Sequence, residues 1–162
     1  MRFVETAGPR GAARPATGKG SVMNILVLED NELTLGFIAT TLRRAGHRVV
    51  TAPNGHAGIR LFDQQGFDLA ITDVFMPDGD GLEFLRHVRA TGPDTPVLAI
   101  SGGARSIEPD FLDAAALLGA AATLCKPFEA QDLVRLVAQF QCGAVVGRLL
   151  AKSRFVPRLV TS

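Results

Sequence analysis

Five polar residues stand where apolar segments of the chain end, and their types together could carry phosphoryl chemistry. They are Glu29, Asp30, Asp73, Ser101 and Lys126. Short apolar runs bounded by Gly, Pro and polar residues indicate buried strands. The carboxyl ends of parallel strands lie along one edge of a sheet, so we predict that these side chains converge there.

Three carboxylates brought together repel one another, and at least one would hold its proton unless a cation joined them. Oxygen ligands select a hard cation, and a site with few protein carboxylates suits Mg²⁺, which keeps several waters and shares phosphate oxygens. The Lys126 ammonium and the Ser101 hydroxyl could hold the remaining oxygens of a phosphoryl group. Asp73, which closes the central apolar run, is the acid we predict to act as nucleophile and form an aspartyl phosphate.

Apolar strands alternate with amphipathic helices from Met23 onward. The predicted strands lie at about 24–29, 47–52, 67–73, 96–101 and 121–125. The predicted helices lie at about 31–45, 54–65, 80–91, 107–119 and 128–140, and Gly46 is the expected stop of the first. Five strands with short helical connections predict a (βα)₅ unit with a parallel sheet covered on both faces.

The composition is that of a soluble globular protein. The 162 residues fit one domain with extensions, and 47% are hydrophobic and 20% charged. No apolar stretch reaches the roughly 18 residues of a membrane span, and the first residues lack a secretory signal pattern. Cys125 and Cys142 have no metal or redox spacing; Cys125 is predicted to be a small core residue, and a reducing cytoplasm is the expected location.

Charge divides the chain into three parts. Acids outnumber Lys and Arg by 15 to 8 between Met23 and Asp132, whereas both flanks are basic. An acidic body argues against nucleic-acid binding by the core. We predict a disordered extension over 1–22, a folded domain over 23–140 and a basic tail without an output domain over 141–162.

The ordered set of motifs resembles the receiver domain of two-component response regulators over roughly Met23 to Phe140. The resemblance rests on Glu29-Asp30, on Asp73 followed by Met76-Pro77 and Gly81, on Ser101, and on Lys126-Pro127-Phe128. It implies the flavodoxin-like doubly wound fold, whose strand order is 2-1-3-4-5.

The resemblance also implies roles. Asp73 would accept a phosphoryl group from a histidine kinase, a phosphotransfer protein or a small phosphodonor. Asp30 and Asp73 would bind Mg²⁺ directly, Phe75 would bind it through its backbone carbonyl, and Glu29 mainly through water. Ser101 and Lys126 would each hold a phosphoryl oxygen, and the Lys126-Pro127 bond would be cis.

Two departures from the family pattern affect the expected switch. The aromatic residue expected three positions before the lysine is Thr123, so the usual coupling between Ser101 and a ring is missing. The positions two beyond Asp73 and two beyond Ser101 are Phe75 and Gly103, and neither side chain can orient an attacking water. We therefore expect slow self-dephosphorylation and, apart from self-phosphorylation from small phosphodonors, no other enzyme activity.

Several functions stay open at this stage. The first is a single-domain response regulator that switches a protein-binding face around the last two predicted helices and the fifth strand. The alternatives are a phosphorelay intermediate or phosphate sink, a degenerate receiver acting as a binding module, and a receiver separated from a hybrid kinase or a DNA-binding regulator. No helix-turn-helix pattern occurs, so direct DNA binding is not expected.

Other motifs have plainer interpretations. The run 78–81 resembles a calcium loop, but the positions that follow it do not continue the pattern, and a turn into a helix is predicted instead. A haloacid-dehalogenase-type phosphatase would need D-x-D on the first strand, where this chain has Glu29-Asp30. His47, His56 and His87 show no ligand spacing and are predicted to lie at the surface.

Overall fold

The computed structural model describes residues 21–76, 81–102 and 115–141. The predictions for the extension and for the basic tail, and most of the predicted helix at 107–119, lie outside these ranges. Within the described part of the chain, no helix is long and apolar enough to cross a membrane.

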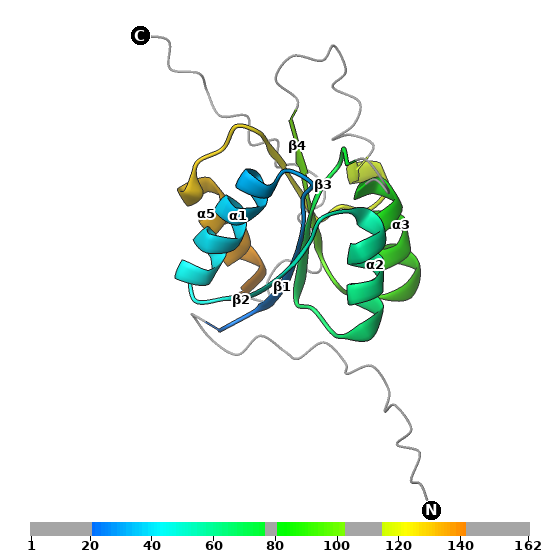
Figure 1. The fold of residues 1–162 in the computed structure, drawn as a ribbon. Coiled ribbons are helices and arrows are strands. Elements are labelled where there is room, and N and C mark those ends of the chain that lie inside the picture. Colours follow the sequence, from blue (N-terminus) through cyan, green and yellow to red (C-terminus); the bar gives the residue numbers. More distant parts are fainter. Residues whose placement is uncertain (1–20, 77–80, 103–114, 142–162) are drawn as a thin grey trace, which may run out of the picture.

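The centre of the fold is a five-stranded parallel sheet in the order β2-β1-β3-β4-β5 (Figure 1). The strands are β1 (Asn24–Leu28), β2 (Arg48–Ala52), β3 (Leu69–Asp73), β4 (Val97–Ser101) and β5 (Ala122–Cys125). Both the parallel arrangement and the predicted strand order are confirmed. The order places β3 in the middle, so the acid that closes β3 lies between the ends of β1 and β4.

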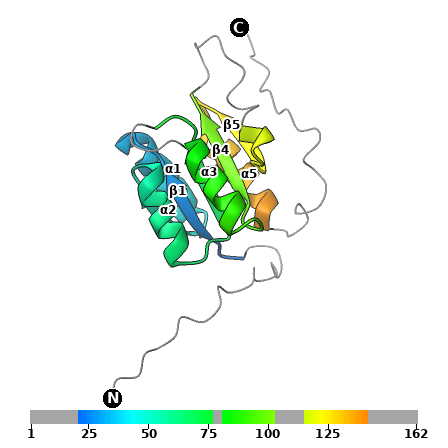
Figure 2. The same ribbon diagram turned by 90° about the vertical axis from the view of Figure 1, so that its right-hand side faces the viewer.

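Within the described ranges, two of the longer helices cover each face of the sheet. They are α1 (Glu32–Arg44) and α5 (Ala130–Gln141) on one face, and α2 (Gly55–Gln64) and α3 (Gly81–Thr91) on the other (Figure 1). Figure 2 shows the sheet from the face that α2 and α3 cover, with these helices near the viewer. The residues 115–117 are helical and end the fourth predicted helix.

Local sequence signals fix where the helices begin and end. The side chains of Asn31 and Asn54 accept hydrogen bonds from the backbone N–H groups of Thr34 and Ala57, at 3.0 and 2.8 Å, and so cap α1 and α2. Gly46 follows α1 with a φ of 94°, which a side chain would disfavour. The predicted stop of the first helix is therefore confirmed.

Alternate residues of each strand enter different cores, because successive side chains of a strand point to opposite faces. Ile25 and Val27 pack in the core under α1 and α5, whereas Leu26 and Leu28 pack in the core under α2 and α3. All four side chains are at most 1% exposed, so β1 is held rigidly. Glu29 and Asp30, which directly follow β1, are therefore held in a fixed position.

Cys125 is exposed, and the prediction that it lies in the core is wrong. β5 is an edge strand whose residues alternate in burial, with Ala122 and Leu124 packed against the α1–α5 core. Thr123 and Cys125 therefore point to the other face of the sheet. An apolar run alone did not indicate that, within the described residues, only one face of this strand packs against a core.

His47 is buried, and its predicted surface position is wrong. Its Nδ1 accepts a hydrogen bond of 3.3 Å from the backbone N–H of Met23, which ties the end of α1 to the start of β1. Of the other histidines, His56 is exposed and His87 is half-buried. His47 is thus a structural acceptor, and burial lowers the pKa of its ring.

The protein is expected to lose stability as the pH falls below neutrality, in part through His47. Because its pKa is lower in the folded than in the unfolded state, the unfolded chain takes up a proton first. The loss begins near the unfolded value of 6.5 and is complete below the folded value. Each pKa unit of lowering corresponds to about 1.4 kcal/mol.

Urea unfolding at neutral and mildly acidic pH measures this effect in wild type and in His47→Asn, whose amide oxygen can replace Nδ1 as acceptor. The pH-dependent loss should be smaller in the variant. An identical loss in both proteins would show that His47 does not titrate on unfolding.

Candidate functional site

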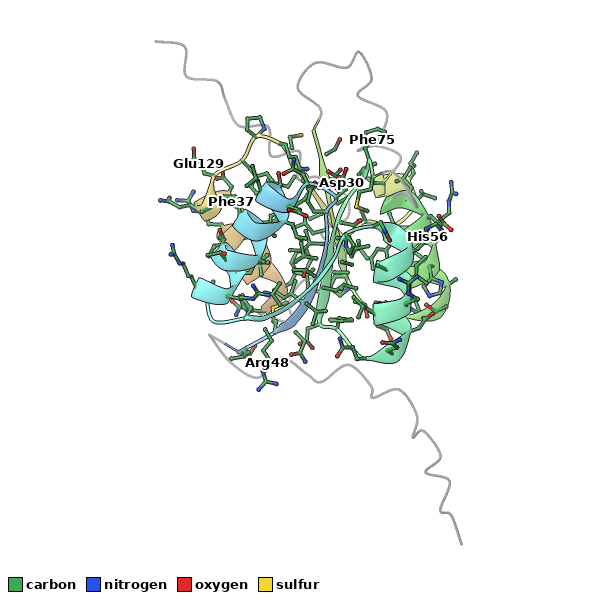
Figure 3. All side chains as sticks on the ribbon, in the orientation of Figure 1. Asp30, Phe37, Arg48, His56, Phe75 and Glu129 are labelled. Carbon is green, nitrogen blue, oxygen red and sulfur yellow. The ribbon has the colours of Figure 1, made fainter. Side chains whose placement is uncertain are left out.

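Three carboxylates meet at the carboxyl edge of the sheet. Oxygens of Glu29, Asp30 and Asp73 all lie within 4.8 Å of one another. β1 and β3 are hydrogen-bonded neighbours, so the acids that follow or close them are brought side by side. Glu29 and Asp73 are buried whereas Asp30 is exposed, and Figure 3 shows Asp30 at the same end of the molecule as Phe75. Oxygen donors of this kind fit a hard divalent cation.

Lys126 bridges two of these acids. Its Nζ lies 2.5 Å from Glu29 Oε2 and 2.6 Å from Asp73 Oδ2. The lysine side chain is 22% exposed, so these charges attract each other with little screening by water. The predicted meeting of carboxylates and ammonium is therefore present in the structure, and the Lys126-Pro127 bond is cis, as expected.

Burial and the neighbouring charges shift the pKa values of two groups in the site. Burial is the main cause that raises the pKa of Glu29; hydrogen bonds from Lys126 and from the Asn31 N–H oppose it, and the charge of Asp73 raises it further. Burial alone would lower the pKa of Lys126, but its hydrogen bonds and its attraction to Asp73 and Glu29 outweigh burial and raise it. A second cation beside these carboxylates would stabilise their ionised forms.

The Asp73 carboxylate is oriented by its own chain. Its Oδ1 accepts a hydrogen bond of 2.9 Å from the Phe75 N–H, which leaves Oδ2 to Lys126. The Thr72 hydroxyl donates to the Asp73 carbonyl at 2.9 Å. Gly81, the first residue of α3, packs so closely that a Cβ there would lie 1.8 Å from that carbonyl oxygen. The close approach requires glycine, a packing role that the sequence pattern alone did not show.

Ser101 is buried at the end of β4, next to β3 on one side and β5 on the other. Its carbonyl accepts a hydrogen bond of 2.8 Å from the Lys126 N–H, so the two predicted site residues are neighbours across the strand ends. Thr123 pairs with Ala99, two residues before Ser101, and is exposed. The structure thus brings Ser101 to the acidic edge and leaves Thr123 outside it.

Replacing Lys126 with methionine is expected to destabilise the protein without Mg²⁺ by about 1–3 kcal/mol, because two buried carboxylates lose their cation. The expected loss is below that for a fully buried pair, since the lysine is partly exposed. Urea unfolding in a chelator and in Mg²⁺ measures it, and Mg²⁺ should restore part of the stability. Equal stability of variant and wild type in the chelator would contradict this account.

An apolar groove of about 500 Å³ lies beside Lys126. It is lined by Leu33, Thr34, Phe37, Gly102, Lys126, Pro127 and Phe128, and we call it the α1 groove. Leu33 and Phe37 are 85% and 43% exposed, outside the buried stripe of α1. Helical periodicity does not place them in the core, and two large apolar residues outside the buried stripe are the signal in the sequence that indicates an exposed apolar surface.

The family comparison agrees with this geometry. The model of the response regulator receiver domain matches residues 25–138. The chain belongs to the family of response regulator receiver domains. Receiver domains of this family bind Mg²⁺ at an acidic pocket and interact with histidine kinases.

The relatives differ in how much of them this chain spans. It is 32% identical to the response regulator receiver protein CpdR of Brucella abortus, over 74% of this chain and 98% of that protein. It is 35% identical to the response regulator protein FleR of Pseudomonas aeruginosa, over 76% of this chain but only 25% of that protein. It is 38% identical to the KDP operon transcriptional regulatory protein KdpE of Escherichia coli, over 68% of this chain and 47% of that protein.

Solved structures show the same fold. The chemotaxis protein CheY4 of Vibrio cholerae aligns with a TM-score of 0.67 at 27% identity, covering 74% of this chain and 99% of that one. A response regulator receiver domain protein from Clostridium thermocellum gives a TM-score of 0.67 at 30% identity, covering 75% and 94%. The predicted flavodoxin-like receiver fold is confirmed.

Proposed function

We propose that this protein is a Mg²⁺-dependent phosphoacceptor that takes a phosphoryl group on Asp73 from a histidine kinase or a phosphotransfer protein. The observation that carries the proposal is the contact of Lys126 Nζ with Asp73 Oδ2, at 2.6 Å, inside a cluster of three acids. A carboxylate held between a fixed ammonium and a cation site has the surroundings that phosphoryl transfer needs.

In the proposed reaction a carboxylate oxygen of Asp73 forms a bond to the phosphorus of the donor. The bond from phosphorus to the donor atom breaks, and its electron pair leaves with that atom. Lys126 and the Ser101 hydroxyl hold phosphoryl oxygens, and the hydrogen bond from the Phe75 N–H keeps the carboxylate in place. Asp30, Asp73 and the Phe75 carbonyl would hold Mg²⁺, with Glu29 acting through water. The ion would neutralise charge on the transferring group.

The downstream role has two candidates. The first is a single-domain response regulator in which phosphorylation switches a surface that binds an unidentified downstream protein, with no direct DNA binding. The second is a phosphorelay intermediate, and the small, exposed Thr123 favours it because no ring is present at that position to report phosphorylation. Amide exchange over 106–128 distinguishes them: a change on phosphorylation supports the switch, and none supports the relay.

The proposal is tested by incubating the purified chain with acetyl phosphate and weighing it intact, with Mg²⁺ and with a chelator. A single phosphoryl adduct that forms only with Mg²⁺ is the expected result. No adduct under either condition would favour a degenerate receiver that serves as a binding module.

The phosphorylated protein is expected to keep its phosphoryl group for minutes or longer. The Phe75 side chain, 49% exposed beside Asp73, has no polar atom that could orient an attacking water. Phe75→Asn should shorten the lifetime by up to about 100-fold, the low end of what a positioned base contributes. The decay of the phosphoryl adduct, followed by intact mass after removal of acetyl phosphate, measures the lifetime in the wild type and in the variant. A wild-type lifetime of seconds would contradict the prediction.

A further inference from the structure

The α1 groove combines exposed apolar side chains with negative charge. Leu33 and Phe37 supply its apolar surface. Glu32 precedes Leu33 in the chain and Glu129 follows Phe128, and Figure 3 shows Phe37 and Glu129 on the same side of the molecule. Among the described residues that line the groove only Lys126 is charged, and it is paired with Glu29 and Asp73. With Asp30 beside them these four groups carry a net negative charge, so the groove fits a ligand that is both apolar and cationic.

A second groove lies further along the seam between α1 and α5. It is also about 500 Å³ in volume and is lined by Thr41, Arg44, Ala45, Ala130, Gln131, Val134 and Arg135; we call it the arginine groove. Arg44 and Arg135 are both exposed. Both charged side chains that line this second groove are cationic and no carboxylate is paired with them in its lining, so it is less favourable to a cationic segment than the α1 groove.

The chain itself contains a segment of the required chemistry. Residues 142–162 carry Arg148, Lys152, Arg154 and Arg158 and no acid, between apolar residues such as Phe155. The segment begins after α5, whose last residue, Gln141, donates a hydrogen bond of 2.8 Å to the Ser21 carbonyl. It therefore starts near the amino end of β1, at the edge of the sheet opposite to the acids.

The segment is long enough to reach the α1 groove. α5 has 12 residues, which corresponds to a length of about 18 Å. An extended chain covers about 3.3 Å per residue, so fewer than half of the 21 residues after Gln141 would return along α5. Because the segment is tethered, its effective concentration at the groove is in the millimolar range.

We propose that residues 142–162 bind the α1 groove of the same molecule, with their apolar side chains against Leu33 and Phe37 and their cations beside the surrounding acids. Bound there, the segment covers the surface next to Lys126 and competes with a protein phosphodonor. That consequence rests on the proposed function, whereas the binding itself does not.

A nitroxide label in the segment tests the binding. The label is placed on Ser153→Cys in a full-length chain that also carries Cys125→Ser and Cys142→Ser. The amide protons of Leu33 and Phe37 are expected to relax faster than those around Arg44. Strongest relaxation at the arginine groove, or no localised relaxation, would overturn the proposal. The measurement needs no phosphorylation, so its failure is distinguishable from failure of the phosphoacceptor proposal.

Two controls identify the occupant and the forces that hold it. In the first control, chains that carry the nitroxide but no isotope label are mixed with isotope-labelled chains that carry no nitroxide. No faster relaxation of the Leu33 amide is expected, and faster relaxation there would mean that the segment of a second copy occupies the groove. In the second control, the four cationic residues of the segment are replaced with glutamate in the nitroxide-labelled chain. The faster relaxation of the Leu33 and Phe37 amides should then be lost. An undiminished effect would remove the charge argument and with it the proposal.

Discussion

Replacing Asp73 with asparagine is expected to leave the protein with no phosphoryl adduct. The amide is close to the carboxylate in shape and can still accept the hydrogen bond from the Phe75 N–H, so the local fold should persist. It has no charged oxygen to attack phosphorus, and it offers Lys126 and a cation only a neutral acceptor. Intact mass after incubation with acetyl phosphate and Mg²⁺ measures the loss.

Asp68→Asn is the matched control. Asp68 is exposed, and its Oδ2 accepts a hydrogen bond of 2.7 Å from the Asn24 N–H at the opposite edge of the sheet. The same chemical change there should leave the adduct at the wild-type level. An adduct that survives in Asp73→Asn would place the acceptor on another acid, with Asp30 the first to test.

Much of the site could be predicted because its residues are tied to strand ends. Asp73 closes a strand with all of its residues buried, and such a strand has no freedom to shift its register. Once the strands are parallel and ordered, the positions of Asp30, Ser101 and Lys126 follow from where their own strands stop. The sequence therefore determined the meeting of these groups without any knowledge of side-chain packing.

The features that could not be predicted depend on contacts between distant segments. His47 is buried where the start of β1 lies beside the start of β2, and its hydrogen bond to the Met23 N–H joins residues 24 positions apart in the chain. Whether Cys125 is buried depends on what covers one face of an edge strand. Composition and periodicity describe a segment alone, so they do not report which neighbour fills the space beside it.

Alanine in place of Gly81 is expected to destabilise the protein by about 3 kcal/mol, the upper end of the usual cost of overpacking. The new Cβ would lie 1.8 Å from the Asp73 carbonyl oxygen and 2.8 Å from both the Asp73 carbonyl carbon and Thr72 Oγ1. The nearest atom belongs to the backbone, so no side-chain rotation relieves the contact. Either α3 or the end of β3 must shift, and phosphorylation of Asp73 should slow as well. Urea unfolding measures the loss of stability.

Gly36→Ala is the matched control because it makes the same change in another helix. Gly36 lies in α1, is exposed, and has no atom within 4 Å of the position that a Cβ would occupy. Alanine there gains helix propensity without a clash, so a stabilisation of up to about 1 kcal/mol is expected. Gly81 is the first residue of α3, where the gain in propensity is at most that at Gly36, so a loss of stability in Gly81→Ala beyond this difference measures the close approach of α3 to the Asp73 carbonyl. If Gly81→Ala were as stable as Gly36→Ala, that approach would not constrain the acceptor.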